Sequence, residues 1–212
     1  MVRPPIALPG HGLAYSEDAM KYAVIDTETT GLDPVRSTIL EIAIAIVIDG
    51  HVVDRWATKV RPSEEDLVLA SSRALEINGY AADQSAWDNA PTWATVAPTV
   101  AAKLKGAIPV GHHVAFDLGM IRACNRRLDV WLPCPVRGVD TMTLAIEHLA
   151  PCGLSRFGLD AIRRWLGWSL EGAHTAEQDV EDTTRLFLLL SRATWWTRTR
   201  LWLGSLWRAG RK

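Results

Sequence analysis

The sequence predicts an α/β fold in which helices flank a mixed five-stranded sheet. Three β-prone segments come first along the 212-residue chain, and short β segments then alternate with helical patterns. Hydrophobic residues make up 48% of the chain and charged residues 22%, which is enough apolar mass for a core and excludes global disorder. We find no internal repeat and no linker, so one domain is expected.

The first three strands are predicted from a buried apolar run and a hairpin signal. Residues 22–26 read as a short buried strand that ends before the turn signals at 29–34. Residues 39–48 are strongly β-prone, and Asp49-Gly50 is typical of a tight hairpin leading into residues 51–60. We therefore expect three antiparallel strands at the start of the fold.

The later elements follow from apolar periodicity and from glycine and proline positions. Residues 64–78 are predicted as one helix that ends at Gly79, which has the position of a C-cap. A helix is expected in the second half of 86–105, although Pro98 weakens it. The remaining prediction is a fourth strand at 108–111, a fifth near Val139, and helices at 115–128, 141–150, 155–166 and 175–192.

Targeting and redox signals indicate a soluble protein of the cytoplasm. Residues 1–20 form an irregular lead-in rich in Pro and Gly, without the apolar run of a signal peptide. No stretch approaches the roughly 18 apolar residues of a membrane span. The three cysteines include no CxxC pair, which favours a reducing compartment over a disulfide framework.

The C-terminal residues 192–212 form a basic tail rich in Trp and Arg. The net charge of the chain is -1, but residues 183–212 contain six Arg, one Lys and no acid, whereas 1–182 hold 16 basic and 24 acidic residues. Four of the ten Trp lie in the last 18 residues. The tail could pack as an amphipathic helix, dock on a DNA polymerase or another protein, stack on nucleic acid, or lie on a membrane surface.

Two acids at the end of the first strand indicate a metal site. Asp26 and Glu28 are two residues apart, so their side chains project from one face of the sheet, at the edge where α/β folds bind ligands. Neighbouring carboxylates repel each other unless a cation lies between them, and oxygen ligands suit Mg²⁺ or Mn²⁺. The alternative is an ordinary exposed strand end.

Two further segments carry candidate residues. Asp117 falls in the first turn of the helix after the fourth strand, where a carboxylate is favoured in any case. His174 and Asp179 would lie about 140° apart on a helix, so His174 is expected in the preceding loop, free to approach what Asp179 binds. A polar surface histidine is the alternative. The simplest interpretation of Glu177, Glu181 and Asp182 is that they are solvated charges on the helix. Of these three, Asp182 is kept as a reserve ligand.

Together these segments resemble the motifs of a nuclease family. VIDTETTGLDP, VGHHVAFD and HTAEQD resemble the three motifs of the DnaQ-like DEDDh 3′→5′ exonucleases, a family that includes proofreading subunits of bacterial replicative polymerases. Residues 73–79 and 159–167 are similar to it more weakly. The resemblance implies a ribonuclease H-like fold and an exonuclease domain at 21–191, between the lead-in and the tail.

The resemblance also implies roles for individual residues. His174 matches the general base, and a pair of Mg²⁺ or Mn²⁺ ions would activate water and stabilise the leaving oxygen. His113 departs from the Asn that the family commonly has, which puts local hydrogen bonding in doubt. The implied metal ligands are Asp26, Glu28, Asp117 and Asp179.

The resemblance further places the substrate beside the first motif. Thr29, Gly31 and Leu32 would border the 3′-terminal nucleotide, with Phe116 as an apolar wall, although Leu32 and Phe116 could equally be core residues. The implied activity is metal-dependent hydrolysis of single-stranded DNA from its 3′ end. The alternatives are an enzyme acting on RNA or oligonucleotides and an inactive scaffold module, against which the presence of all five motif residues argues.

Overall fold

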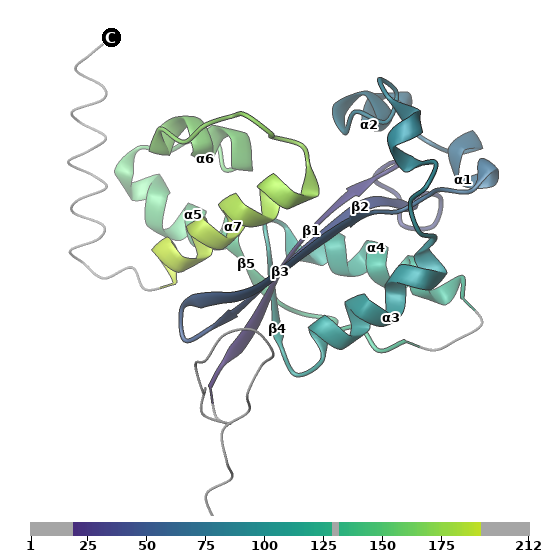
Figure 1. Cartoon of the computed structure of the whole chain (residues 1–212). Helices are drawn as coiled ribbons and strands as arrows, with labels where there is room; N and C mark the ends of the chain where they lie inside the picture. Colours follow the sequence, from purple (N-terminus) through teal and green to yellow (C-terminus); the bar gives the residue numbers. More distant parts are fainter. Residues whose placement is uncertain (1–18, 129–131, 192–212) are drawn as a thin grey trace, which may run out of the picture.

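A five-stranded sheet with the strand order β3-β2-β1-β4-β5 forms the centre of the fold (Figure 1). A computed structural model of the chain describes residues 19–128 and 132–191. The first three strands are antiparallel, and β4 and β5 continue the sheet parallel to β1, which confirms the predicted mixed sheet. The strands are β1 (Lys21–Thr29), β2 (Ile39–Ile48), β3 (His51–Lys59), β4 (Ile108–Gly111) and β5 (Val139–Asp140).

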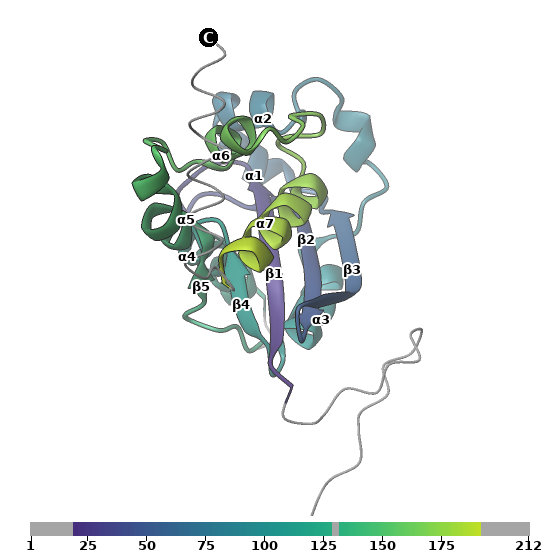
Figure 2. The ribbon, with the colours of Figure 1, turned by 90° about the vertical axis from the view of Figure 1, so that its left-hand side faces the viewer.

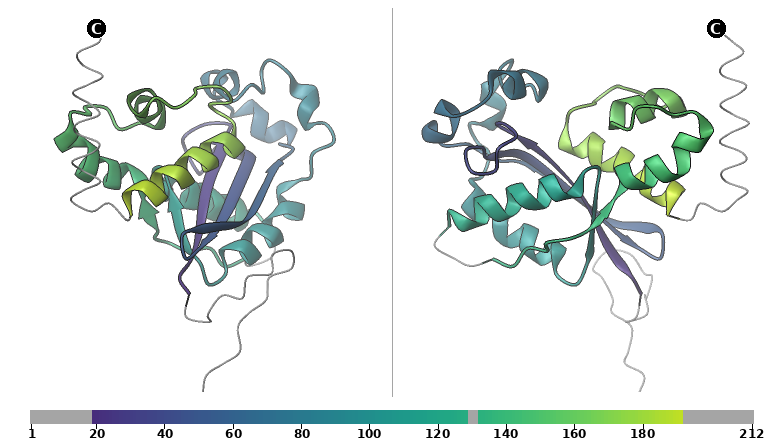
Figure 3. Two further views of the ribbon diagram at one scale, coloured as in Figure 1. Left: turned by 60° about the vertical axis from the view of Figure 1, so that its left-hand side comes forward. Right: turned by 180° about the vertical axis from the view of Figure 1, so that it is seen from behind.

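Helices cover both faces of this sheet. In Figure 2, α7 crosses in front of the strands while α3 lies behind them, and Figure 3 shows the two layers from two further sides. The helices are α1 (Glu64–Val68), α2 (Ser72–Ile77), α3 (Trp93–Leu104), α4 (Val114–Arg126), α5 (Thr141–Leu149), α6 (Leu159–Leu166) and α7 (Ala176–Leu190), with short 3-10 turns η1 (Gln84–Trp87) and η2 (Ala150–Cys152).

The prediction of a single helix over 64–78 is wrong. The segment forms α1 and α2, each with its own serine N-cap: the side chain of Ser63 accepts from the amide of Asp66, and that of Ser71 from the amide of Ala74. The amide of Ser71 donates to the carbonyl of Thr30 at 2.7 Å, which ties the break to the end of β1. Serine hydroxyls compete with the helical backbone and so favour a new start.

The start of the sixth helix also differs from the prediction. It begins at Leu159 rather than near residue 155, because Gly158 has an extended backbone (φ −67°, ψ 150°) and occupies the N-cap. The predicted C-cap at Gly79 is confirmed in its conformation, with a φ of 78° directly after α2 and Asn78. Only a residue without a Cβ adopts this left-handed conformation freely.

The alternation of β1 side chains divides the core and positions the site. Ala23 and Ile25 pack with α3 and α4, whereas Val24 packs with Val180 of α7. All ten residues of β2 are buried, because this strand is covered on both faces. The even-numbered residues of β1 beyond Val24 therefore face α7.

Two predicted segments lie outside the described residues. Most of the lead-in at 1–20 and the whole Trp- and Arg-rich tail at 192–212 belong to this part of the chain. Within the ranges that the structure describes, no helix is both long enough and apolar enough to cross a membrane.

Candidate active site

Asp26 and Glu28 project from the end of β1 on the face covered by α7. They follow Val24 in the alternation of the strand, and both precede the register shift between Glu28 and Thr29. Each is partly buried. The predicted common face of the two carboxylates is therefore the face toward α7.

Asp179 and His174 approach this point from α7 and the loop before it. Thr175 caps α7, so Asp179 lies in the first turn, where it is 9% exposed, and His174 lies outside the helix, as predicted. His174 has a φ of 68°, and its side chain is 48% exposed. One potential ligand atom from each of Glu28, His174 and Asp179 lies within 4.8 Å of the other two.

Asp117 enters from the other side of β1. It lies in the first turn of α4, is 3% exposed, and accepts a hydrogen bond of 2.8 Å from the Thr27 hydroxyl. A Cβ on Gly111 would lie 3.2 Å from Asp117 Oδ2 and 3.0 Å from the Val114 Cα, so only glycine leaves the carboxylate its room. The structure thus places Asp117 within electrostatic range of Asp26.

The unusual His113 is the N-cap of α4. Its φ of 78° lies in the left-handed region, where Asn and His occur more often than most other side chains. Its amide donates to Asp140 Oδ1 at 3.2 Å. The substitution of Asn by His is therefore compatible with the backbone conformation of the second motif.

The carboxylates of the site disfavour one another's ionisation. Burial, and then the charges of Asp117, Asp179 and Glu28, raise the pKa of Asp26. Burial, followed by the charge of Asp179, raises the pKa of Glu28 to about 8. Burial raises the pKa of Asp117 to about 7, although the Thr27 hydrogen bond opposes it. Such oxygen-rich, negatively charged surroundings fit hard divalent cations.

Arg163 of α6 is the residue that sequence reasoning missed. Its guanidinium is buried and binds Asp179 at 2.7 Å, Asp182 at 2.8 Å and Asp160 at 3.0 Å. Asp182 is thus the buried partner of an arginine and not a solvated charge, whereas its use as a reserve ligand stays a prediction. Glu177 and Glu181 are exposed, as predicted. The sequence does contain a signal for this residue. Residues 159, 162, 163 and 166 form the stripe of the helix that faces the core, and an arginine occupies one of these positions.

The predicted substrate residues differ in how much they expose. Leu32 is 82% exposed and so is not a core residue, whereas Phe116 is partly buried against the α3–α4 core. The Thr29 hydroxyl donates to the carbonyl of Gly31 at 2.8 Å. A Cβ on Gly31 would meet the Ser37 hydroxyl at 2.8 Å. Thr29 and Gly31 therefore shape the turn that presents Leu32.

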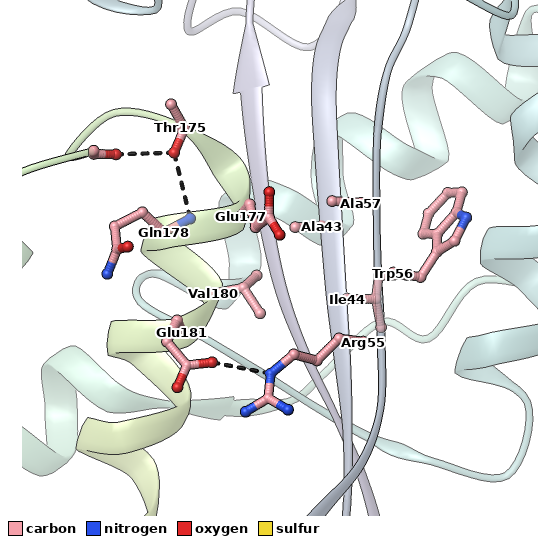
Figure 4. Close-up of a pocket in the computed structure, with 11 residues that line it drawn as sticks. Ala43, Ile44, Arg55, Trp56, Ala57, Thr175, Glu177, Gln178, Val180 and Glu181 are labelled. Atoms are coloured by element: carbon pink, nitrogen blue, oxygen red, sulfur yellow. Dashed lines mark hydrogen bonds and ion pairs between the residues drawn. The ribbon is translucent and has the colours of Figure 1, made fainter. Parts of the chain in front are cut away.

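A cavity of about 480 Å³, distinct from the candidate site, lies between α7 and the strands β2 and β3 (Figure 4). Ala43 and Ala57 are among its lining residues, and Arg55 pairs with Glu181 across it at 3.1 Å. None of the five predicted catalytic or metal-binding residues lines it. Glu177 and Glu181 on one wall make it a poor path for a phosphate backbone.

Comparison with known proteins identifies the family. A family model described as an exonuclease (RNase T) matches residues 23–187, which include all five predicted residues. The chain belongs to this exonuclease family. The matched residues are an exonuclease domain homologous to 3′-5′ exonucleases, consistent with the DnaQ-like resemblance. The family depends in general on divalent metal ions.

Individual relatives of this exonuclease domain are parts of larger proteins. The chain is 30% identical over 182 residues to a DNA polymerase III PolC-type of Clostridium perfringens, covering 86% of this chain and 12% of the relative. It is 28% identical over 168 residues to a Staphylococcus aureus protein named 3′-5′ exonuclease DinG, covering 79% and 18% respectively. The chain therefore spans less than a fifth of the length of these relatives.

Solved structures confirm the fold. The chain superposes on E. coli exonuclease I in complex with a dT13 oligonucleotide with a TM-score of 0.70 and 18% identity, over 87% of this chain and 43% of the other. This similarity shows that the mixed sheet with its flanking helices is a ribonuclease H-like fold.

Proposed function

We propose that this exonuclease domain is a metal-dependent 3′→5′ exonuclease that hydrolyses single-stranded DNA from its 3′ end. The observation that supports the proposal is the approach of four carboxylates from three separate segments, β1, α4 and α7, toward one end of β1, with His174 beside them. The names of the relatives point to DNA as the substrate.

The four carboxylates would hold the metal ions. Asp26, Glu28, Asp117 and Asp179 supply oxygen ligands, which suit a pair of Mg²⁺ or Mn²⁺ ions. Such ions supply the activation of a water and the stabilisation of the negatively charged leaving oxygen in phosphodiester hydrolysis. Holding these carboxylates close together costs free energy, because they are buried and repel one another, and positive charge offsets that cost.

His174 would accept the proton of the attacking water at an imidazole nitrogen. Its side chain is half exposed and lies within 4.8 Å of ligand atoms of Glu28 and Asp179, so it reaches both the site and the solvent. Its position in a loop before α7 allows it to move toward the reacting phosphate. An imidazole nitrogen can accept and release a proton, which suits a general base.

Leu32 and Phe116 would contact the terminal base. Leu32 exposes an apolar side chain two residues after the buried Thr30, at the same end of β1 as Asp26 and Glu28. Apolar contact with a base needs no particular sequence, which fits degradation from an end. Thr29 and Gly31 contribute by holding the turn in place.

A time course on strands labelled at the 3′ or the 5′ end tests the proposal. With Mg²⁺ or Mn²⁺, the 3′ label should be released first as mononucleotide, and EDTA or Asp26→Asn should stop release. Matched RNA strands in parallel decide between DNA and the alternative, an enzyme acting on RNA or oligonucleotides. Release from the 5′ end, or absence of hydrolysis with either metal, would contradict the proposal and favour an inactive scaffold module.

Residues 21–191 are proposed as the complete catalytic domain, working in the cytoplasm. The family match within 23–187 supports these limits.

The similarity to a DNA polymerase III suggests a polymerase, or another protein, as the partner of residues 192–212, although these residues lie outside the described part of the chain. Binding of a polymerase lost on deletion of 192–212, with hydrolysis retained, is the expected result.

A further inference from the structure

The buried guanidinium of Arg163 links the metal-binding part of the candidate site, at Asp179, to the part that contains the proposed base, His174. We propose that Arg163 is a positioning residue, which orients Asp179 toward the divalent cations and, through Asp160, orients His174. The inference rests on the proposed function. Arg163 lies on α6, which supplies none of the five predicted catalytic residues, and its side chain is 1% exposed.

The first arm of the guanidinium reaches Asp179. Arg163 Nη2 donates to Asp179 Oδ1 at 2.7 Å, and the amide of His174 donates to the same oxygen at 3.3 Å. Within the described residues both donors to this carboxylate go to Oδ1, which leaves Oδ2 for a cation. A carboxylate held by one oxygen cannot rotate freely, so its second oxygen keeps one direction.

The second arm reaches the proposed base through Asp160. Arg163 Nη1 donates to Asp160 Oδ1 at 3.0 Å, and Asp160 Oδ2 lies 3.6 Å from His174 Nε2. One oxygen of Asp160 is therefore fixed by the buried arginine while the other faces the imidazole. A carboxylate beside a histidine selects the orientation of its ring and stabilises the imidazolium formed when it accepts a proton.

The third arm is an internal control. Arg163 Nε donates to Asp182 Oδ2 at 2.8 Å, and Gln178 donates to the same oxygen at 3.1 Å. Asp182 is buried between α6 and α7. None of these bonds links it to Glu28 or His174. This arm anchors the guanidinium, so its loss should affect folding more than metal binding.

Lysine at position 163 separates charge from geometry. It keeps the positive charge, but an ammonium has no planar fork and cannot hold three carboxylates in fixed directions. We expect Arg163→Lys to weaken Mn²⁺ binding, measured by titration calorimetry, about 10- to 100-fold, the usual effect of losing a partner of a metal ligand. Arg55→Lys, an exposed arginine paired with Glu181, is the matched control and should bind as wild type.

Two further variants test the arms separately. Asp160→Asn should lower kcat while KM and Mn²⁺ affinity stay near wild type, because only the His174 arm is changed. Asp182→Asn should lower the melting temperature with Mn²⁺ affinity unchanged. Wild-type Mn²⁺ affinity in a folded Arg163→Lys variant, equal weakening by Asp182→Asn, or an unchanged kcat in Asp160→Asn would overturn the inference.

The calorimetric measurement keeps this inference separate from the proposed function. If Arg163→Lys weakens Mn²⁺ binding although wild type hydrolyses no strand, the exonuclease proposal fails and the Asp179 arm stands. If wild type hydrolyses 3′ ends and Arg163→Lys leaves Mn²⁺ binding intact, the function stands and the inference fails. Should Arg163→Lys not fold, Asp160→Asn still tests the His174 arm.

Discussion

The Thr27 hydroxyl donates to Asp117 Oδ1 at 2.8 Å, across 90 residues of sequence. Thr27 stands between Asp26 and Glu28 in β1 and points to the opposite face of the sheet. The same three residues thus supply two carboxylates to one face and, on the other, the hydrogen bond that orients a third carboxylate. This arrangement makes Thr27 a test of how Asp117 is held.

Thr27→Val should lower hydrolysis about 10- to 100-fold with little change in shape. Valine has nearly the volume of threonine but no donor, so the buried Asp117 would lose a bond that favours its charged form. The rate should recover partly at higher Mg²⁺ concentration, which a metal titration of kcat/KM measures. Thr58→Val on β3 is the control, and equal loss in both variants would contradict the specific role.

His174→Ala should reduce kcat by about 10²- to 10⁴-fold, the usual contribution of a general base. Mn²⁺ should still bind, because the carboxylates of Glu28, Asp26, Asp117 and Asp179 remain. Single-turnover hydrolysis measures the first effect and calorimetry the second. A near-normal single-turnover rate would remove His174 from the mechanism.

The metal-free protein should lose stability as the pH rises from about 4.5 to about 8. In that window folded Glu28 (pKa about 8) and Asp117 (pKa about 7) hold protons that the unfolded chain, with ordinary pKa values of 4.5 and 3.8, has released. Because the folded state binds more protons than the unfolded state in this window, the free energy of unfolding falls as the pH rises. Thermal melts in EDTA should show a lower melting temperature near the upper end of the window.

Divalent cations should reverse this trend. They compete with protons for the same carboxylates, so the rise in melting temperature on adding Mg²⁺ should be larger at about pH 8 than at about pH 5. Asp26→Asn removes a carboxyl group whose own pKa is raised and should flatten the pH dependence in EDTA. A melting temperature in EDTA that rises steadily through the window would refute this account.

Leu32→Ala should weaken binding of single-stranded DNA roughly 3- to 10-fold, the scale expected for losing part of an apolar contact. Because Leu32 is 82% exposed, the melting temperature should stay within about 1 °C. The KM for a single-stranded oligonucleotide measures the effect. Val68→Ala at an 83% exposed position is the matched control, and an equal change in KM there would show that position 32 is not special.

Local patterns in the sequence predicted most of the fold. Alternating and continuous apolar runs mark the strands, and the spacing of Asp26 and Glu28 correctly predicts a common face. The break at Ser71 escaped prediction because its amide is bound by Thr30, far away in sequence. A hydrogen bond between residues so far apart leaves no periodic pattern in the local sequence.

The supporting residues of the site were harder to find than its acids. Arg163 meets Asp179 and Asp182 only because α6 folds back on α7, and this contact reverses the expectation of a solvated Asp182. Thr27 lies between two predicted ligands, but its bond to Asp117 could not be predicted because it depends on the packing of α4 against β1. Residue types indicate the chemistry, whereas the tertiary fold determines which neighbours assist it.

The origin of the carboxylates in segments far apart along the chain has a consequence for biosynthesis. Asp26 and Glu28 leave the ribosome before Asp179, which follows about 150 residues later. A nascent polypeptide arrested before α7 therefore lacks one of the four carboxylates of the proposed metal site. In the proposed mechanism, activity should begin only when α7 has emerged and docked on β1.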